Sequence, residues 1–160
     1  MPRRLLRDGR VVDDDWSYAA DAAADAAAVI LTLAEWQNER DAWLSRAARL
    51  GVVLQPAHKV EVLASDFARL SLIAADFSGP SDGRGYSQAR VLREQWSFRG
   101  ELRATGFVRR DQLFFMARSG FNSFELPESE LESAAAALAT FSWAYQPSND
   151  TGLAVKLQRR

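Results

Sequence analysis

Residues 71–107, SLIAADFSGPSDGRGYSQARVLREQWSFRGELRATGF, decide the predicted fold. Two short runs rich in Leu, Ile and Phe, at 71–77 and 101–107, flank a longer stretch with a different period. In that stretch the apolar side chains recur at the spacing of a helix: Tyr86, Ala89, Leu92 and Trp96. A strand, a helix and a second strand predict a βαβ unit, in which the two strands run parallel and the crossover is right-handed.

The same alternation extends in both directions along the chain. Strands are expected at 29–36, 52–56, 71–77, 101–107 and 121–127, and helices at 38–51, 60–70, 85–96, 109–120 and 128–145. Gly51, Gly100 and Gly120 are each expected to end a helix, and Pro127 to open the last one. We therefore predict an α/β fold of five consecutive βα units that form a parallel sheet, either a half-barrel or an open sheet.

The two ends of the chain are expected to lie outside these units. RRLLRDGRVVDDDW (residues 3–16) predicts an N-terminal β-hairpin that turns at Asp8–Gly9, and the Ala-rich segment after it predicts a surface linker. We predict one α/β domain over residues 1–145, with the hairpin and linker in 1–28 and the βα units in 29–145. Residues 146–160 are predicted to be a flexible tail.

Composition excludes several classes of site. The 160-residue chain is 48% apolar and 26% charged, as is typical of a globular protein, and it has no cysteine and one histidine. Disulfides, thiolate zinc sites, cysteine-ligated iron–sulfur clusters and a cysteine nucleophile are therefore excluded, as is a cluster of histidine ligands. The net charge of −1, the short apolar runs and the lack of a signal peptide predict a cytoplasmic protein that binds neither nucleic acid nor membrane.

The loop after the third predicted strand is the most informative segment. FSGPSDGRGYS (residues 77–87) makes its βα unit longer than its neighbours by about ten residues. Ligands of parallel α/β folds bind at the carboxyl ends of the strands, where this loop is expected to lie. Glycines let the backbone approach a ligand, and Arg84 is suited to clamping an oxyanion through two hydrogen bonds. The alternative is an ordered turn before a capped helix.

The loop does not match the nucleotide-binding motifs it partly resembles. The third glycine of a dinucleotide fingerprint is replaced by Gln88, and no lysine follows as in a P-loop. An inorganic oxyanion, or a small phosphorylated or sulfurylated molecule, is the favoured ligand.

Charge is distributed unevenly along the chain. Residues 13–41 contain eight acids and one base, whereas residues 84–118 contain eight arginines and three acids. The basic segment is either a set of solvated helix faces or a patch that meets an anionic ligand or an acidic partner.

Other strand ends carry carboxylates. Glu35, Asp76 and Glu125 are expected on the same edge of the sheet as the loop, either as acid or base groups or as salt bridges that anchor it. His58 is expected on that edge too, where a surface role is the simpler interpretation.

The stretch DGRGYSQARVLREQWSFRGELRATGFVRRDQLFFMARSGFNSFEL (residues 82–126) resembles the central block of a family of small bacterial proteins of unknown function. Members are commonly labelled probable oxidoreductases of sulfite reduction, because they accompany assimilatory sulfite reductase. The DGRVVDDDW segment and Trp36 extend the resemblance weakly over most of the chain. The resemblance covers Asp82, Gly83, Arg84, Gly85, Tyr86, Ser87, Arg103, Asp111 and Gln112 as motif positions and transfers no catalytic residue. We predict these nine residues as the ligand-binding set.

The sequence leaves three functions open. The first is an accessory protein of assimilatory sulfite reduction that binds an anionic ligand through the Arg/Gly-rich loop. The second is an oxidoreductase subunit with an unrecognised cofactor such as a flavin, since proteins supply redox centres through cofactors, metals or cysteine. The third is a docking partner of sulfite reductase. The two exposed edges of a parallel sheet would also permit a homodimer.

Overall fold

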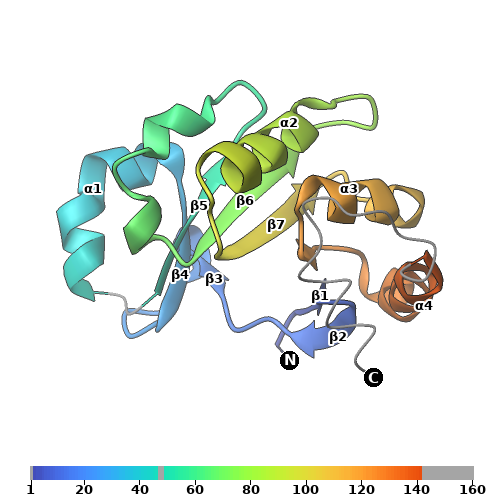
Figure 1. The fold of residues 1–160 in the computed structure, drawn as a ribbon. Coiled ribbons are helices and arrows are strands. Elements are labelled where there is room, and N and C mark those ends of the chain that lie inside the picture. The colour runs from blue at the N-terminus through green and yellow to red at the C-terminus, as the bar shows by residue number, and fades with distance from the viewer. Residues whose placement is uncertain (1, 47–48, 142–160) are drawn as a thin grey trace.

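The computed structural model describes residues 2–46 and 49–141, which form a mixed α/β fold around one sheet (Figure 1). The strands of this part of the chain are β1 (Arg4–Arg7), β2 (Arg10–Asp13), β3 (Ser17–Tyr18), β4 (Ala28–Thr32), β5 (Arg49–Leu54), β6 (Leu72–Phe77), β7 (Glu101–Gly106) and β8 (Ser123–Phe124). The α-helices are α1 (Leu33–Arg46), α2 (Arg84–Arg90), α3 (Leu113–Ser119) and α4 (Leu131–Phe141).

The sheet is an open, curled half-barrel with the strand order β2-β1-β8-β7-β6-β5-β4-β3. Neighbouring strands from β3 to β8 pair in parallel, whereas β1 pairs antiparallel with both β2 and β8. The α/β class is therefore confirmed, and of the two predicted forms the chain adopts the half-barrel. The parallel strands follow one another in sequence order, so their carboxyl ends lie along one edge of the sheet, which we call the carboxyl edge.

The predicted N-terminal hairpin is confirmed. Arg4 pairs with Asp13 and Arg7 with Arg10, and the turn residues Asp8 and Gly9 have φ angles of 50° and 80°. Two positive φ angles are typical of the turn that matches the twist of a two-residue hairpin. The hairpin is also part of the main sheet, because β1 adds to β8 and α4 packs against both of its strands (Figure 1).

The first helix starts earlier than the sequence pattern indicated. Residues 33–36 were expected to be strand, but α1 begins at Leu33. Thr32 and Glu35 form a reciprocal cap: the Glu35 N–H donates to Thr32 Oγ1, and the Thr32 N–H donates to the Glu35 carboxylate at 2.7 Å. This capping box stabilises a helix that starts at Leu33, although the apolar run of residues 29–36 favours a strand there.

Two of the three expected helix-ending glycines have other roles. Gly51 lies inside β5, where an added Cβ would come 2.9 Å from Leu72 Cδ2, so a close strand contact explains this glycine. Gly100 directly precedes β7 and does not have a positive φ angle. The residue with a positive φ angle after the preceding helix is Ser97, so Gly100 does not end that helix. Gly120, with a φ of 124°, does end α3 as predicted.

The detail of five βα units is not confirmed. Residues 60–70 form two short 3₁₀ turns, Val60–Leu63 and Phe67–Arg69, in place of an α-helix. Asp66, between them, is buried and accepts a hydrogen bond from Trp36 Nε1 at 2.9 Å. This long-range contact holds the backbone in a conformation that local helix propensity does not favour.

Two further segments also differ from the prediction. The predicted linker contains β3, which pairs in parallel with β4 and adds a strand to the sheet. The helix after the Arg/Gly-rich loop is α2, continued by a π-helical turn at Val91–Gln95.

The core lies mainly between the sheet and the helices α1, α2 and α3, which Figure 1 shows side by side along one face. Ile73 and Ala75 of β6 point into this core, whereas Leu72 and Ala74 pack with Trp16 on the opposite face. The alternation follows from the two-residue period of a strand. Both faces of β6 are therefore buried, as expected for a parallel strand in the middle of a sheet.

The predicted tail and the last part of the helix expected to end at residue 145 lie outside the described residues. The predicted domain limits therefore remain a prediction. Among the helices that the structure describes, none has the length and apolar character needed to cross a bilayer.

Gly85 is expected to be indispensable for packing α2 onto the sheet. An added Cβ would lie 2.6 Å from Cζ of Phe77, whose ring is buried and packed against Phe121. Overpacking costs about 1–3 kcal/mol, and the better helix propensity of alanine offsets about 1 kcal/mol of this. Gly85→Ala should therefore lower the free energy of unfolding in urea by up to about 2 kcal/mol.

The matched control is Gly79→Ala, since a Cβ there meets no atom within 4 Å. This variant should unfold at the urea concentration of the wild type. Equal stability of the two variants would contradict the packing assigned to Gly85.

Candidate functional site

A groove of about 800 Å³ opens at the carboxyl edge, between the segment that follows β7 and the start of the α4 region. We call it the carboxyl-edge groove, and its lining residues are Gly106, Phe107, Val108, Arg109, Arg110, Asp111, Pro127, Glu130 and Ser133. Its volume lies in the range typical of sites for small molecules. It also lies where ligands of parallel α/β folds bind.

Two neighbouring arginines give the groove its cationic character. Arg109 and Arg110 are exposed, and within the described residues neither forms an ion pair with a carboxylate. The Arg109 guanidinium lies over the Phe107 ring, 4.6 Å from its centroid, which holds it at the groove wall. Guanidinium groups with free N–H donors in a groove are suited to binding an oxyanion.

Carboxylates and a hydroxyl gather at the same edge, beside the groove. Asp76 is the penultimate residue of β6, lies opposite Thr105 of β7, and is so close to Gly106 that an added Cβ there would be 2.5 Å from Asp76 Oδ1. Burial, followed by the negative charges of Asp82 and Glu125, raises the pKa of Asp76 above its ordinary value. Asp76 is therefore within reach of the charges of Asp82 and Glu125, while the acid, base or loop-anchoring role of Asp76 and Glu125 stays a prediction. Among the described residues, no three His, Asp or Glu side chains are grouped in a way that could hold a metal ion.

The Arg/Gly-rich loop is braced by its own aspartate. Asp82 accepts hydrogen bonds from the Arg84 N–H at 3.1 Å, from Arg84 Nη2 at 2.8 Å and from Ser78 Oγ at 3.1 Å. The bonds from Arg84 hold the pKa of Asp82 well below its usual range. Arg84 is 62% exposed and is directed back to Asp82, so a ligand would have to compete with an internal ion pair. Ligand binding by this loop remains a prediction.

The next residues of the predicted site serve packing and a second groove. Gly85 is buried against Phe77, and the Tyr86 ring meets the Phe77 ring edge-on with centroids 5.3 Å apart. Tyr86 and Ser87 also line a groove of about 560 Å³ between α2 and α3. We call it the α2–α3 groove, and its lining residues are Tyr86, Ser87, Arg90, Phe115, Arg118 and Ser119.

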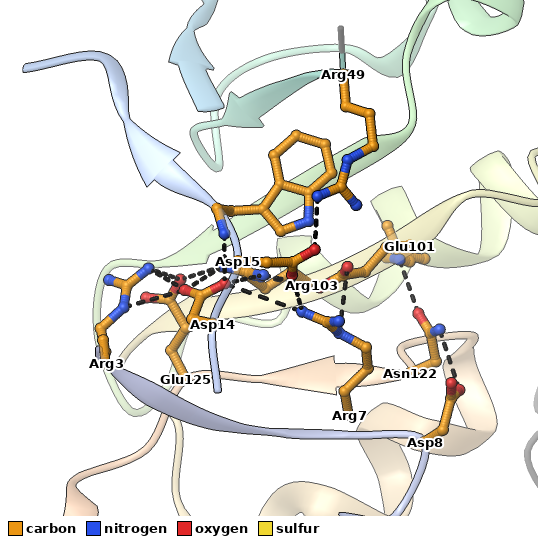
Figure 2. Close-up of polar contacts among 12 residues, drawn as sticks. Arg3, Arg7, Asp8, Asp14, Asp15, Arg49, Glu101, Arg103, Asn122 and Glu125 are labelled. Atoms are coloured by element: carbon orange, nitrogen blue, oxygen red, sulfur yellow. Dashed lines mark hydrogen bonds and ion pairs between the residues drawn. The ribbon is translucent and has the colours of Figure 1, made fainter. Parts of the chain in front are cut away.

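Arg103 does not face a solvent-filled site. Its side chain is fully buried, and each guanidinium nitrogen donates to a carboxylate: Nε and Nη2 to Glu101, Nη1 and Nη2 to Asp14, and Nη1 to Glu125, at 2.9–3.1 Å (Figure 2). Tyr18 Oη also donates to Glu125 at 2.8 Å. Burial alone would lower the pKa of Arg103, but these carboxylates raise it above its usual range. The geometry supports a structural role for Arg103.

The remaining predicted residues, Glu35, Asp111, Gln112 and His58, do not form one site. Glu35 caps α1, so its carboxylate is occupied by the Thr32 backbone. Asp111 lines the carboxyl-edge groove, whereas Gln112 is half-buried beside it. His58 Nδ1 accepts a hydrogen bond from the Gln55 N–H at 3.0 Å, so this nitrogen is engaged by the backbone.

Sequence reasoning missed the cations of the groove and the partners of Arg103. Arg109 and Arg110 are part of the basic segment 84–118 and open a predicted helix, but they are not among the predicted ligand-binding residues, although an Arg–Arg pair soon after a predicted strand is a usable signal. Asp14 is 89 residues from Arg103 in the chain, and no local pattern relates the two.

The chain belongs to a known family. The family model described as "Bacterial protein of unknown function (DUF934)" matches residues 51–155, which is more than half of the chain. No curated protein matches the chain significantly. Membership in a bacterial family of unknown function, implied by the resemblance of residues 82–126, is therefore confirmed, whereas the association with sulfite reduction remains an expectation.

Removal of the buried guanidinium should destabilise the protein strongly. Arg103→Met preserves the apolar stem but leaves the buried Asp14 carboxylate without its main partner. Breaking one side of a buried ion pair costs about 3–5 kcal/mol, and we expect a loss of this size in urea unfolding. Arg4→Met, which removes an exposed pair with Glu128, is the control and should leave stability nearly unchanged. Similar losses in both variants would refute the role assigned to Arg103.

Asp76 should destabilise the folded protein at neutral pH. Its pKa is raised in the folded state, so folding favours the protonated form and the ionised form carries a free-energy cost. Asp76→Asn should therefore melt at a higher temperature than the wild type at pH 7, and the difference should vanish by about pH 3, below the unfolded-state pKa.

The variant Asp82→Asn tests the opposite case, a carboxyl group whose pKa is lowered by folding. The pKa of Asp82 is lowered by Arg84, so this change should lower the melting temperature at pH 7. A lower melting temperature of Asp76→Asn at pH 7 would disprove the electrostatic cost assigned to Asp76.

Proposed function

We propose that this protein binds a small anionic molecule, an oxyanion or a phosphorylated or sulfurylated metabolite, in the carboxyl-edge groove, and that it is an accessory protein of assimilatory sulfite reduction. One observation carries the binding proposal. Arg109 and Arg110 are adjacent in the groove and form no ion pair with a carboxylate of the described residues.

Three other arginines of the basic segment 84–118 are already engaged within the described residues. Arg103 and Arg84 are engaged by carboxylates, and Arg93 donates to the carbonyl groups of Phe98, Gly100 and Gly120. Exposed, weakly hydrated guanidinium groups in a concave site offer forked N–H donors to two oxygen atoms of one ligand. The proposal therefore moves the cationic contact from the Arg/Gly-rich loop to the loop after β7.

The Arg/Gly-rich loop has a supporting role in this proposal. Its Asp82 lies close enough to Asp76 to raise the pKa of that carboxyl group, and Asp76 in turn contacts Gly106 in the groove wall. The loop therefore shapes the wall behind the groove. A change in the loop would be transmitted to the groove through Asp76.

The proposed place in sulfite reduction depends on the resemblance of residues 82–126 to proteins that accompany assimilatory sulfite reductase. The chemistry of the groove is compatible with it. Sulfite and sulfate are small oxyanions with several acceptor oxygens, which a pair of guanidinium groups can bind through charge-assisted hydrogen bonds.

Binding is tested by thermal shift and calorimetry with sulfite, sulfate and phosphate on wild type, Arg109→Gln and Arg110→Gln. A ligand at 100 times its dissociation constant adds about 2.7 kcal/mol of stability, which should raise the melting temperature of the wild type by roughly 5–10 °C. Each glutamine variant should weaken binding about tenfold or more, because a charge-assisted hydrogen bond is worth about 1.5–3 kcal/mol.

Arg69→Gln provides the control, since Arg69 is exposed on a 3₁₀ turn outside the groove and should bind as the wild type does. A wild type that responds to none of the three anions would overturn the binding proposal and favour a protein that docks on the reductase.

A further inference from the structure

The carboxyl-edge groove contains more than a site for a bare oxyanion. Besides the two arginines it is lined by Asp111 and Glu130, whose carboxylates would repel an inorganic anion. Ionised carboxylates are hydrogen-bond acceptors only, so they bind hydroxyl groups of a ligand, as acidic residues bind the hydroxyls of a ribose. The groove is therefore suited to a ligand that has both a phosphate-like group and a hydroxylated part.

The α2–α3 groove lies close to Asp111. Asp111 belongs to the carboxyl-edge groove and Tyr86 to the α2–α3 groove. After burial, the charge of Asp111 is the next cause that raises the pKa of Tyr86, so the two side chains are near each other. Asp111, Phe115 and Arg118 are also spaced by four and three residues, which places them along one side of the segment that contains α3.

Phe115 provides an aromatic surface at that position. It is 60% exposed, whereas the other phenylalanines whose side chains the structure describes are buried or half-buried. It lies in the α2–α3 groove with Arg90 and Arg118. An exposed ring flanked by guanidinium groups can stack on a planar base. The rise per residue of the 3₁₀ turn and of α3 places Phe115 roughly 9 Å beyond Arg110 along the helix, a span suited to a sugar between phosphate and base.

We propose that the two grooves bind one ligand of the nucleotide class: phosphate at Arg109 and Arg110, ribose hydroxyls at Asp111 and Glu130, and the base stacked on Phe115. This inference depends on the proposed anion site and names its ligand class. It involves binding alone, and no bond is made or broken.

The test is calorimetry with four probes: inorganic phosphate, ribose 5-phosphate, adenosine and AMP. In the wild type, AMP should bind about tenfold or more tightly than ribose 5-phosphate, since stacking on an aromatic side chain is worth about 1–3 kcal/mol per base. Phe115→Ala should weaken AMP about tenfold and leave ribose 5-phosphate unchanged, and Phe115→Trp should retain AMP binding. Val62→Ala, at an exposed apolar residue elsewhere, is the control and should change neither.

Asp111→Asn tests the sugar contact, because it should change the affinity for inorganic phosphate and the affinity for ribose 5-phosphate in different ways. It should tighten inorganic phosphate, because a like charge is removed, and should weaken ribose 5-phosphate relative to phosphate about tenfold, because hydroxyl contacts to a charged acceptor are lost. Parallel changes for the two probes would overturn the ribose assignment.

The outcomes separate this inference from the proposed function. If phosphate and ribose 5-phosphate bind through Arg110 but AMP binds no more tightly, the anion site is upheld and the nucleotide inference is overturned. If Phe115→Ala leaves AMP binding unchanged, the stacking site is overturned in the same way. If no phosphate-bearing probe binds, the nucleotide inference is overturned, whether or not adenosine binds, and the proposed anion site is overturned too when sulfite and sulfate also fail to bind.

Discussion

The burial of Arg103 is the constraint on which the rest of the structure depends. A guanidinium group removed from water needs hydrogen-bond acceptors or opposite charges around it, because desolvating its charge costs several kcal/mol. Asp14, Glu101 and Glu125 meet this need from three different segments: the chain after the hairpin, β7 itself and the end of β8 (Figure 2). The ion pairs therefore tie the N-terminal segment to the middle of the sheet.

This arrangement explains why the two faces of the half-barrel differ. One face is covered by α1, α2 and α3 and buries an apolar core. The other carries Trp16 on Leu72 and Ala74, and next to them the charged cluster around Arg103. Such a buried cluster favours one register of the hairpin and of the segment after it, because any shift would leave a charge unpaired.

The carboxyl edge combines features that stability alone does not explain. Asp76 is held at a raised pKa beside Asp82 and Glu125, and Arg109 and Arg110 form no ion pairs within the described part of the chain. Like charges held together and cations without partners lower stability, and they are typical of sites that bind or react. The buried Arg103 is paired with three carboxylates, whereas Arg109 and Arg110 line a groove without such a pair among the described residues. This contrast is the physical basis for placing the function there.

The sequence by itself determined the features that depend on neighbouring residues. The parallel strands β6 and β7, the hairpin turn at Asp8–Gly9 and the end of α3 at Gly120 follow from apolar period and from φ preferences, which act within a few residues. The tertiary structure decided what depends on distant contacts. Residues 60–70 form 3₁₀ turns in place of the predicted helix, and Asp66 between these turns is hydrogen-bonded to the distant Trp36. Strand β3 pairs with β4 although its segment has no strand pattern. Arg103 is a structural residue because Asp14, 89 residues away, neutralises it, while Arg109 and Arg110 lie in a groove without a carboxylate partner among the described residues. The chemical role of a charged side chain depends on the charges folded against it, and only the tertiary structure sets these.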